Sequence, residues 1–270
     1  MKAEKVLEML ATAAPRWAGV VTGPPGSGKT TFLKALLHYY PDIITVSVKD
    51  NLKCQKINVS EEIIARRISG VLHFTASDGL RISFDILNGK KLEEIENQAG
   101  KFKPEVAEWI INRIRALKSL KNNNGEIEVP TCLNDFDEII RRLVIGILYV
   151  ARPSITSPII IDDALAFVIN RPYYDAFSAM MRPYLFSINR YLDSRELLQF
   201  NPVIITPGGA GVSAGVFATT PSLLYVEQQP GGPDRLARPE KYVVLYDGKR
   251  YEIRFEDIQR IAEGKKNGKK

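Results

Sequence analysis

The feature that most constrains the fold of this chain is the stretch Gly23-Pro24-Pro25-Gly26-Ser27-Gly28-Lys29-Thr30. It matches the pattern G-x-x-x-x-G-K-[ST] of a phosphate-binding P-loop at every constrained position. Glycines let consecutive backbone N–H groups point inward at phosphate oxygens, and the helix N-terminus that follows adds partial positive charge. A glycine turn without a ligand is the alternative. The apolar strand expected at 17–22 and the helix expected at 31–37 favour the phosphate site.

Each part of this loop has an expected role at a bound nucleotide. Lys29 would place its ammonium on the β- and γ-phosphates, and Thr30 would offer its hydroxyl to Mg²⁺. The expected cofactors are therefore ATP and Mg²⁺. The residues expected to bind the nucleotide are Gly23, Pro24, Pro25, Gly26, Ser27, Gly28, Lys29, Thr30 and Thr31.

A second motif lies at Ile159-Ile160-Ile161-Asp162, an apolar run that ends in a carboxylate. This is the Walker B pattern, and it predicts Asp162 as the residue that holds the metal opposite the P-loop. Asp163 has two interpretations: a base that polarises the attacking water, or the N-cap of a helix that begins at Ala164. Asp50, just past a strand expected at Ile43–Val48, is the alternative base.

The composition is that of an ordinary soluble globular protein, with 45% hydrophobic and 25% charged residues. No apolar run approaches the ~20 residues that span a membrane. The amphipathic N-terminal segment lacks the apolar core of a signal peptide. We therefore expect a cytoplasmic protein without a membrane span.

Three further features give little information about function: the cysteines, the histidines and the C-terminal tail. Cys54 and Cys132 are far apart in sequence, and we expect them to be free thiols. His38 and His73 sit beside aromatic residues, which favours packing or surface roles over catalysis. Four lysines in the tail 265–270 supply most of the net charge of +6. This flexible basic tail either contacts nucleic acid or is a solvated end.

The first half of the chain predicts a helix over 2–13 and a helix with Ser60 as its N-cap. Asp78-Gly79 between Val71–Thr75 and Leu80–Ile86 predicts a β-hairpin. Further along, one or two helices are expected within 90–121, and Asn134 or Asp135 is expected to cap a helix that runs to about Val150.

In the second half, an aromatic stripe predicts a helix over about 172–198. A buried strand at Val203–Thr206, a glycine-rich loop at Pro207–Gly215, a strand at Leu223–Val226 and a closing hairpin at Lys241–Phe255 follow. The expected fold is α/β, a mostly parallel sheet flanked by helices. We expect one P-loop ATPase domain over 1–264, with an insertion at about 52–150.

With both motifs in place, the chain resembles the RecA-like P-loop ATPases of the ASCE group, either of the RecA and KaiC type or of the HerA and FtsK type. The resemblance rests on Gly23–Thr31, Ile159–Asp163 and Val203–Thr206. It implies a polar residue that senses the γ-phosphate at the end of the strand after Walker B, which Thr206 matches. The residues with expected catalytic roles are Lys29, Asp163, Asp50 and Thr206.

The resemblance implies an oligomeric motor or switch, with DNA as a partner through Pro207–Gly215. A slow ATPase that regulates assembly of a protein complex is the second hypothesis, and a small-molecule kinase is the third. No N-K-x-D motif is present, which disfavours a GTPase. A homo-oligomer could also use an arginine finger. Its candidates are Arg190, Arg195, Arg235 and Arg238.

Overall fold

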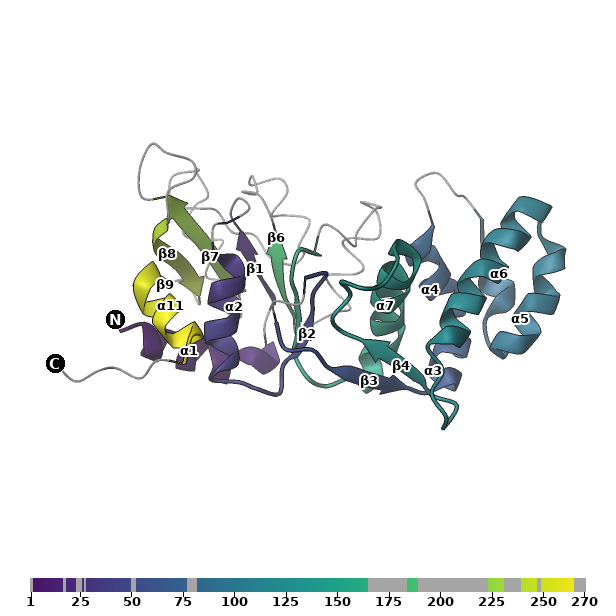
Figure 1. The fold of residues 1–270 in the computed structure, drawn as a ribbon, viewed down its shortest axis with the longest axis horizontal. Coiled ribbons are helices and arrows are strands. Elements are labelled where there is room, and N and C mark those ends of the chain that lie inside the picture. Colours follow the sequence, from purple (N-terminus) through teal and green to yellow (C-terminus); the bar gives the residue numbers. More distant parts are fainter. Residues whose placement is uncertain are drawn as a thin grey trace. The chain divides into compact units, whose positions relative to one another are not determined.

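The computed structural model in Figure 1 describes residues 2–16, 18–22, 26, 28–49, 52–76, 82–164, 184–188, 223–230, 239–246 and 249–264. The chain divides into two compact units. The first takes the described residues up to Val46, from Ser157 to Ala164, and from Tyr184 onward. The second takes Ser47–Thr156, which contains the stretch that we expected to be an insertion. Helices and strands are both present, so the expected α/β class is confirmed.

A seven-stranded sheet forms the centre of the first unit, in the order β2-β5-β6-β1-β7-β8-β9. Neighbouring strands from β2 to β7 pair in parallel, and the β7–β8 and β8–β9 pairs are antiparallel. The P-loop strand β1 is therefore separated from β5, which precedes Asp162, by one strand. The strands are β1 Ala18–Thr22, β2 Ile44–Val46, β5 Ile159–Ile161, β6 Tyr184–Ile188, β7 Leu223–Pro230, β8 Pro239–Tyr246 and β9 Lys249–Arg254.

Strand β6, at 184–188, corrects our prediction of a helix over about 172–198 in its described part. The rest of that segment lies outside the described residues. Tyr184, Leu185, Phe186 and Ser187 are all buried in the described structure. A parallel strand between two others has both faces covered, so its sequence is apolar throughout and lacks the alternation of a half-exposed strand. Periodicity alone cannot distinguish such a run from a buried helix.

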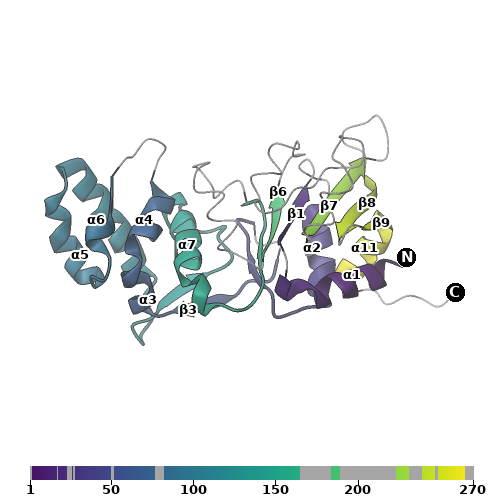
Figure 2. The same cartoon turned by 180° about the vertical axis from the view of Figure 1, so that it is seen from behind.

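Three helices of the first unit, α1 Ala3–Thr12, α2 Lys29–Leu37 and α11 Phe255–Ala262, pack against one another beside the sheet (Figures 1 and 2). A 3₁₀ turn, Ala14–Arg16, joins α1 to β1. Helix α1 buries Val6, Leu7 and Leu10, as its amphipathic pattern predicts. Arg260 of α11 pairs with Glu4 of α1 at 3.3 Å. The sequence analysis missed α11, whereas the strands at Leu223–Val226 and in the closing hairpin are confirmed.

The second unit is mostly helical and includes a two-stranded antiparallel sheet of β3 and β4. Ser60 caps α3 by accepting a hydrogen bond from the Glu62 amide, as predicted. Asp137, and not Asn134 or Asp135, caps α7. The elements are β3 Lys56–Val59, α3 Glu61–Arg66, α4 Ile68–Thr75, α5 Leu92–Gln98, α6 Pro104–Ser119, β4 Ile127–Pro130, α7 Glu138–Ala151 and the 3₁₀ turns Asp85–Leu87, Ala99–Lys101 and Arg152–Ser154.

The β-hairpin that we predicted around Asp78-Gly79 is wrong in its described parts. Val71–Thr75 belongs to helix α4, and 82–84 is not a strand. Helix α4 packs against α7 and buries Ile68, Val71, Leu72 and Phe74. These residues are spaced so that they lie on one face of a helix. Packing of this face against α7 overrides the strand preference of the β-branched and aromatic residues.

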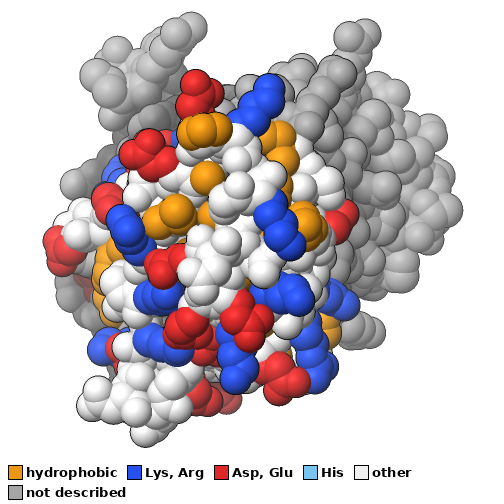
Figure 3. All heavy atoms as spheres, turned by 90° about the vertical axis from the view of Figure 1, so that its right-hand side faces the viewer, with side chains coloured by type: hydrophobic (Ala, Val, Ile, Leu, Met, Phe, Trp, Pro, Cys, Tyr) orange, Lys and Arg blue, Asp and Glu red, His pale blue; other side chains and the backbone are white. Residues whose placement is uncertain are grey.

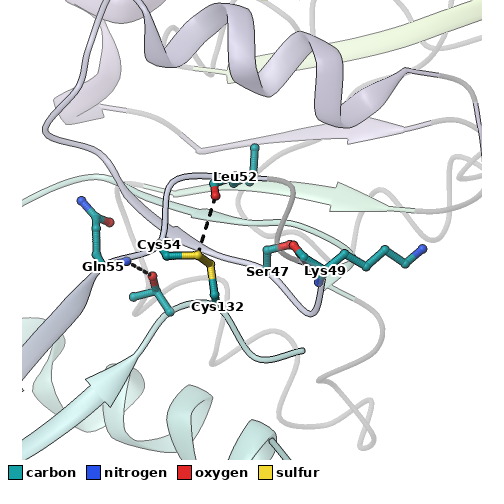
Figure 4. The surroundings of a disulfide bond; sticks show 7 residues. Ser47, Lys49, Leu52, Cys54, Gln55 and Cys132 are labelled. Atoms are coloured by element: carbon teal, nitrogen blue, oxygen red, sulfur yellow. Dashed lines mark hydrogen bonds between the residues drawn. A yellow bond between two sulfur atoms is a disulfide. The ribbon is translucent and has the colours of Figure 1, made fainter. Parts of the chain in front are cut away.

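A disulfide joins Cys54 to Cys132, which corrects our prediction of free thiols (Figure 4). Strand β3 pairs antiparallel with β4, with Lys56 opposite Pro130, and the same register continues to place Cys54 opposite Cys132. Their Cα atoms are 5.2 Å apart. The bond closes a loop of 78 residues and stabilises the second unit by restricting its unfolded chain. Disulfides are rare in a reducing cytosol, so this bond does not support the cytoplasmic location that we expected. That location stays a prediction.

Helices α4 and α7 approach closely at Gly146. A Cβ atom added to Gly146 would lie 3.0 Å from both the Cα and the carbonyl oxygen of Val71. Backbone atoms cannot move aside as a flexible side chain can, so alanine would force the two helices apart. No helix in the described part of the chain is both long and apolar enough to cross a membrane.

We expect Gly146→Ala to destabilise the second unit by about 1–3 kcal/mol, the usual cost of overpacking. Intrinsic helix propensity alone predicts the opposite sign, a gain of up to about 1 kcal/mol. Urea unfolding followed by circular dichroism measures the difference. Gly100→Ala is the matched control, because a Cβ there meets nothing within 4 Å. A stabilised Gly146→Ala variant would show that the helix contact is looser than described.

Candidate functional site

The described part of the P-loop has the backbone that its glycines permit. Gly26 and Gly28 have φ angles of 79° and 83°, in the left-handed region that favours glycine. Gly28 is the N-cap residue of α2, whose first residue is Lys29. The first amides of this helix lack partners within the helix and can face an anion. Gly23, Pro24, Pro25 and Ser27 lie outside the described residues.

Two motifs separated by more than a hundred residues meet at the start of α2. Thr30 Oγ1 donates a hydrogen bond to Asp162 Oδ2 over 3.0 Å. Asp162 follows β5 directly, and its amide donates to the Val46 carbonyl at 2.8 Å, which continues the β2–β5 ladder. Lys29 and Asp162 are only 5% and 7% exposed. Lys29, the neighbour of Thr30 in the chain, and Asp162, its hydrogen-bond partner, are thus both buried.

Asp163 has a φ angle of 57°, the only positive φ among the described non-glycine residues. An N-cap residue ordinarily has an extended backbone, so this angle argues against the N-cap interpretation. Aspartate tolerates the left-handed conformation at some cost, and such strained residues cluster at functional sites. Asp163 is half-buried, directly after the carboxylate that contacts Thr30.

Ser187 of β6 is a polar residue of this region that the sequence analysis missed. It pairs with Val21 of β1, and its preceding residue Phe186 pairs with Ile161 of β5. Continuing that register by one residue places Ser187 level with Asp162, so both side chains emerge on the same face of the sheet. The Ser187 hydroxyl is buried, with no hydrogen-bond partner among the described residues. The sequence signal that could have identified Ser187 is a single polar residue within an apolar segment.

Tyr242 of β8 is a second residue that the sequence analysis did not single out. Its hydroxyl donates to the Gly28 carbonyl oxygen at 2.8 Å. Its ring lies 5.3 Å from that of Phe32 and 5.8 Å from that of Phe255. Burial raises the pKa of the hydroxyl, so Tyr242 stays protonated and remains a donor at all physiological pH values. The closing hairpin thereby holds the last glycine of the P-loop.

We expect Tyr242→Phe to weaken nucleotide binding by roughly 5-fold, because one neutral hydrogen bond contributes about 1 kcal/mol. The ring contacts with Phe32 and Phe255 are kept, so the fold should persist. Calorimetric titration with ADP and Mg²⁺ measures the change. Tyr251→Phe, on the neighbouring strand β9, is the control. Equal affinities for Tyr242→Phe and the wild type would show that this hydrogen bond does not position the loop.

The structure thus brings together most of the described residues that the sequence predicted. Lys29, Thr30 and Thr31 lie in the first turn of α2, and Asp162 and Asp163 lie at the end of β5. The other two expected catalytic residues, Asp50 and Thr206, lie outside the described residues. So do the loop Pro207–Gly215 and the four arginine-finger candidates.

Comparisons with protein-family models, with curated proteins and with solved structures gave no match. Within the described residues, no group of three or more His, Cys, Asp and Glu side chains could hold a metal ion. The arrangement around Thr30 and Asp162 must therefore be interpreted from its own chemistry.

Proposed function

We propose that the first unit binds ATP with Mg²⁺ at the start of α2 and hydrolyses it. The observation that carries this proposal is the hydrogen bond between Thr30 and Asp162, which joins a complete P-loop sequence to a carboxylate at the end of a parallel strand. The carboxyl ends of parallel strands in open α/β sheets are where ligands usually bind. A glycine turn without a ligand would not require a lysine and an aspartate that are both buried at the two motifs.

The donor atoms fit Mg²⁺. This ion prefers oxygen ligands, keeps several waters, and is usually held by one or two carboxylates together with substrate phosphates. The Thr30 hydroxyl and the Asp162 carboxylate supply such a set, which needs no cluster of three acidic residues. When bound, Mg²⁺ neutralises charge that develops on the phosphates.

The other residues of this site have separate proposed roles in catalysis. Lys29 and the first amides of α2 orient the phosphates and stabilise their negative charge. Asp163 is our proposed base, because it directly follows the carboxylate proposed to hold the metal and has a strained backbone of the kind that clusters at functional sites. Asp50 remains the alternative base. Ser187, near the end of β6 beside β5, is a second candidate for the γ-phosphate sensor that we expected at Thr206.

The order of the strands supports a RecA-like ATPase. That group places one strand between the P-loop strand and the Walker B strand, and β6 occupies this position between β1 and β5. The antiparallel strands β8 and β9 at one edge also agree with this group. We had expected the strand after Walker B at Val203–Thr206, which lies outside the described residues.

We expect the base assignment to be decided by two variants. Asp163→Asn should lower the hydrolysis rate by roughly 10²-fold or more, a typical contribution of general-base catalysis. Asp50→Asn should hydrolyse ATP at close to the wild-type rate. Steady-state phosphate release measures both. The reverse pattern, a normal Asp163→Asn and an inactive Asp50→Asn, would assign the base to Asp50.

The biological role is proposed in two forms, each with a homo-oligomer. One is a motor or switch that acts on DNA, and the other is a slow ATPase that controls assembly of a protein complex. Hydrolysis rates with and without single- and double-stranded DNA, at several salt concentrations, separate them. Light scattering gives the oligomeric state.

Stimulation of hydrolysis by DNA supports the motor. An active ATPase that binds no DNA in any nucleotide state supports the assembly role, and transfer of phosphate to an acceptor other than water would indicate a kinase.

A further inference from the structure

Two arginines of the second unit lie close together with a shortage of acidic partners. Arg113 belongs to α6 and Arg142 to α7, and these helices pack against each other. Burial, and next the positive charge of Arg142, lower the pKa of Arg113 to about 10. The positive charge of Arg142 therefore acts on Arg113, which itself stays charged at neutral pH.

Arg113 is half-buried and has weak polar contacts. Its Cζ atom lies 4.1 Å from the centre of the Trp109 ring, and Nη1 donates to the Trp109 carbonyl over a long 3.4 Å. Its Nε is buried without a hydrogen-bond partner. No carboxylate in the described structure pairs with Arg113, and none contributes to its pKa shift. The Trp109 ring also stacks on Phe84, with ring centres 5.4 Å apart, so the guanidinium is held on a rigid aromatic support.

Arg142 has one acidic partner, Glu138, one turn earlier on the same helix. The Glu138 side chain is 72% exposed, whereas that of Arg142 is 22% exposed. An ion pair with so exposed a carboxylate is worth little, because water screens it. The Arg142 Nε is also buried without a partner in the described structure. Among the described residues, Arg142 therefore has one solvated carboxylate as its partner and Arg113 has none.

A buried guanidinium without a counter-ion is costly, and each unsatisfied donor in a native structure requires an explanation. Guanidinium groups match phosphate oxygens in paired, charge-assisted hydrogen bonds. A phosphate group carries close to two negative charges and so balances both arginines, whereas a single carboxylate balances one. We propose that Arg113 and Arg142 form a binding site for a phosphate group, separate from the P-loop.

The surface of this unit favours a small phosphate ligand over a nucleic-acid strand. Figure 3 faces the side of this unit that bears α5 and α6, where Lys and Arg side chains are interspersed with Asp and Glu. The described part of this face carries no continuous basic track of the kind that follows a nucleic-acid backbone. The ligand could be free phosphate or the phosphate of a nucleotide, and the two are distinguished by titration.

Trp109 provides a local signal for the test, because it contacts Arg113 and is one of only two tryptophans in the sequence. Trp17→Phe leaves it as the sole indole fluorophore, so binding at the P-loop gives no direct tryptophan signal. The full chain with this change is titrated with inorganic phosphate, with ADP and with acetate, against potassium chloride at equal ionic strength. We expect a saturable fluorescence change with phosphate or with ADP. The ligand that binds more tightly, phosphate or ADP, identifies the source of the phosphate group.

Substitutions then assign the signal to the pair. Arg113→Gln should weaken binding by about ten-fold or more, as expected for loss of a charge-assisted contact. Arg115→Gln, an exposed position two residues along α6, should have no effect. Glu138→Gln removes the competing carboxylate from an exposed site and should tighten binding severalfold in a folded protein. A purely structural arginine pair would not respond in this way.

The proposal is overturned if neither phosphate nor ADP gives a saturable signal, or if Glu138→Gln leaves the affinity unchanged. Acetate binding as tight as that of phosphate would also overturn it, in favour of a carboxylate site. Each outcome is independent of the proposed ATPase, whose residues all lie in the first unit or outside the described part of the chain.

Discussion

Replacing Lys29 by alanine is expected to abolish tight binding of ATP with Mg²⁺. Lys29 is the one lysine that the P-loop motif directs at the β- and γ-phosphates, and it is 5% exposed at the first position of α2. A charge-assisted contact in so dry a site is worth several kcal/mol, because water does not screen it. We therefore expect the affinity to fall by about 10²-fold or more.

Calorimetry with ATP and Mg²⁺ measures this loss, and circular dichroism tests that the variant is folded. Lys34→Ala is the matched control, because Lys34 is exposed on the same helix and should leave the affinity unchanged. A folded Lys29→Ala variant that binds nucleotide as tightly as the wild type would rule out the P-loop as the nucleotide site.

The site could be predicted from sequence where a residue type and its spacing reflect a local requirement. Gly28 must adopt a positive φ, and Thr30 must follow it at a fixed distance for its hydroxyl to reach a metal. The apolar run before Asp162 is the signature of a strand buried on both faces. These local rules hold whatever the rest of the chain does. An apolar strand that ends in aspartate is common, so the Walker B prediction also depended on the complete P-loop upstream.

The errors arise where partners distant in sequence decide the local structure. Tyr184–Ile188 is a strand because β1 and β5 lie on either side of it, and nothing within that segment distinguishes a buried strand from a buried helix. Val71–Thr75 is helical because α7 covers it. The Cys54–Cys132 disulfide depends on the pairing of β3 with β4, which we had not predicted.

The role of Tyr242 could not be predicted for the same reason. A tyrosine in a strand with alternating residues is usually a packing residue, and only the position of β8 brings its hydroxyl to Gly28. The Arg113–Arg142 pair likewise becomes visible only when α6 packs against α7. Sequence motifs thus give the chemistry that a ligand requires, and the tertiary fold adds the residues that position it.

Replacing Asp162 by asparagine is expected to leave nucleotide binding largely intact but to remove hydrolysis. Asparagine keeps the size of the side chain and can still accept the hydrogen bond from Thr30, so the buried end of β5 should keep its structure. The lost negative charge is what would hold the metal in place as charge develops on the phosphates. A metal contributes several kcal/mol of transition-state stabilisation, and about 4 kcal/mol corresponds to a rate loss of about 10³-fold.

Steady-state phosphate release and ADP affinity, measured on the same preparation, separate the two effects of Asp162→Asn. Asp42→Asn is the matched control, since Asp42 is an exposed carboxylate of the same unit and lies outside the proposed site. If the metal contact is what Asp162 supplies, raising the Mg²⁺ concentration should recover part of the lost rate, because mass action favours metal binding to the weakened site. Hydrolysis at the wild-type rate would instead show that the Thr30–Asp162 contact is only structural.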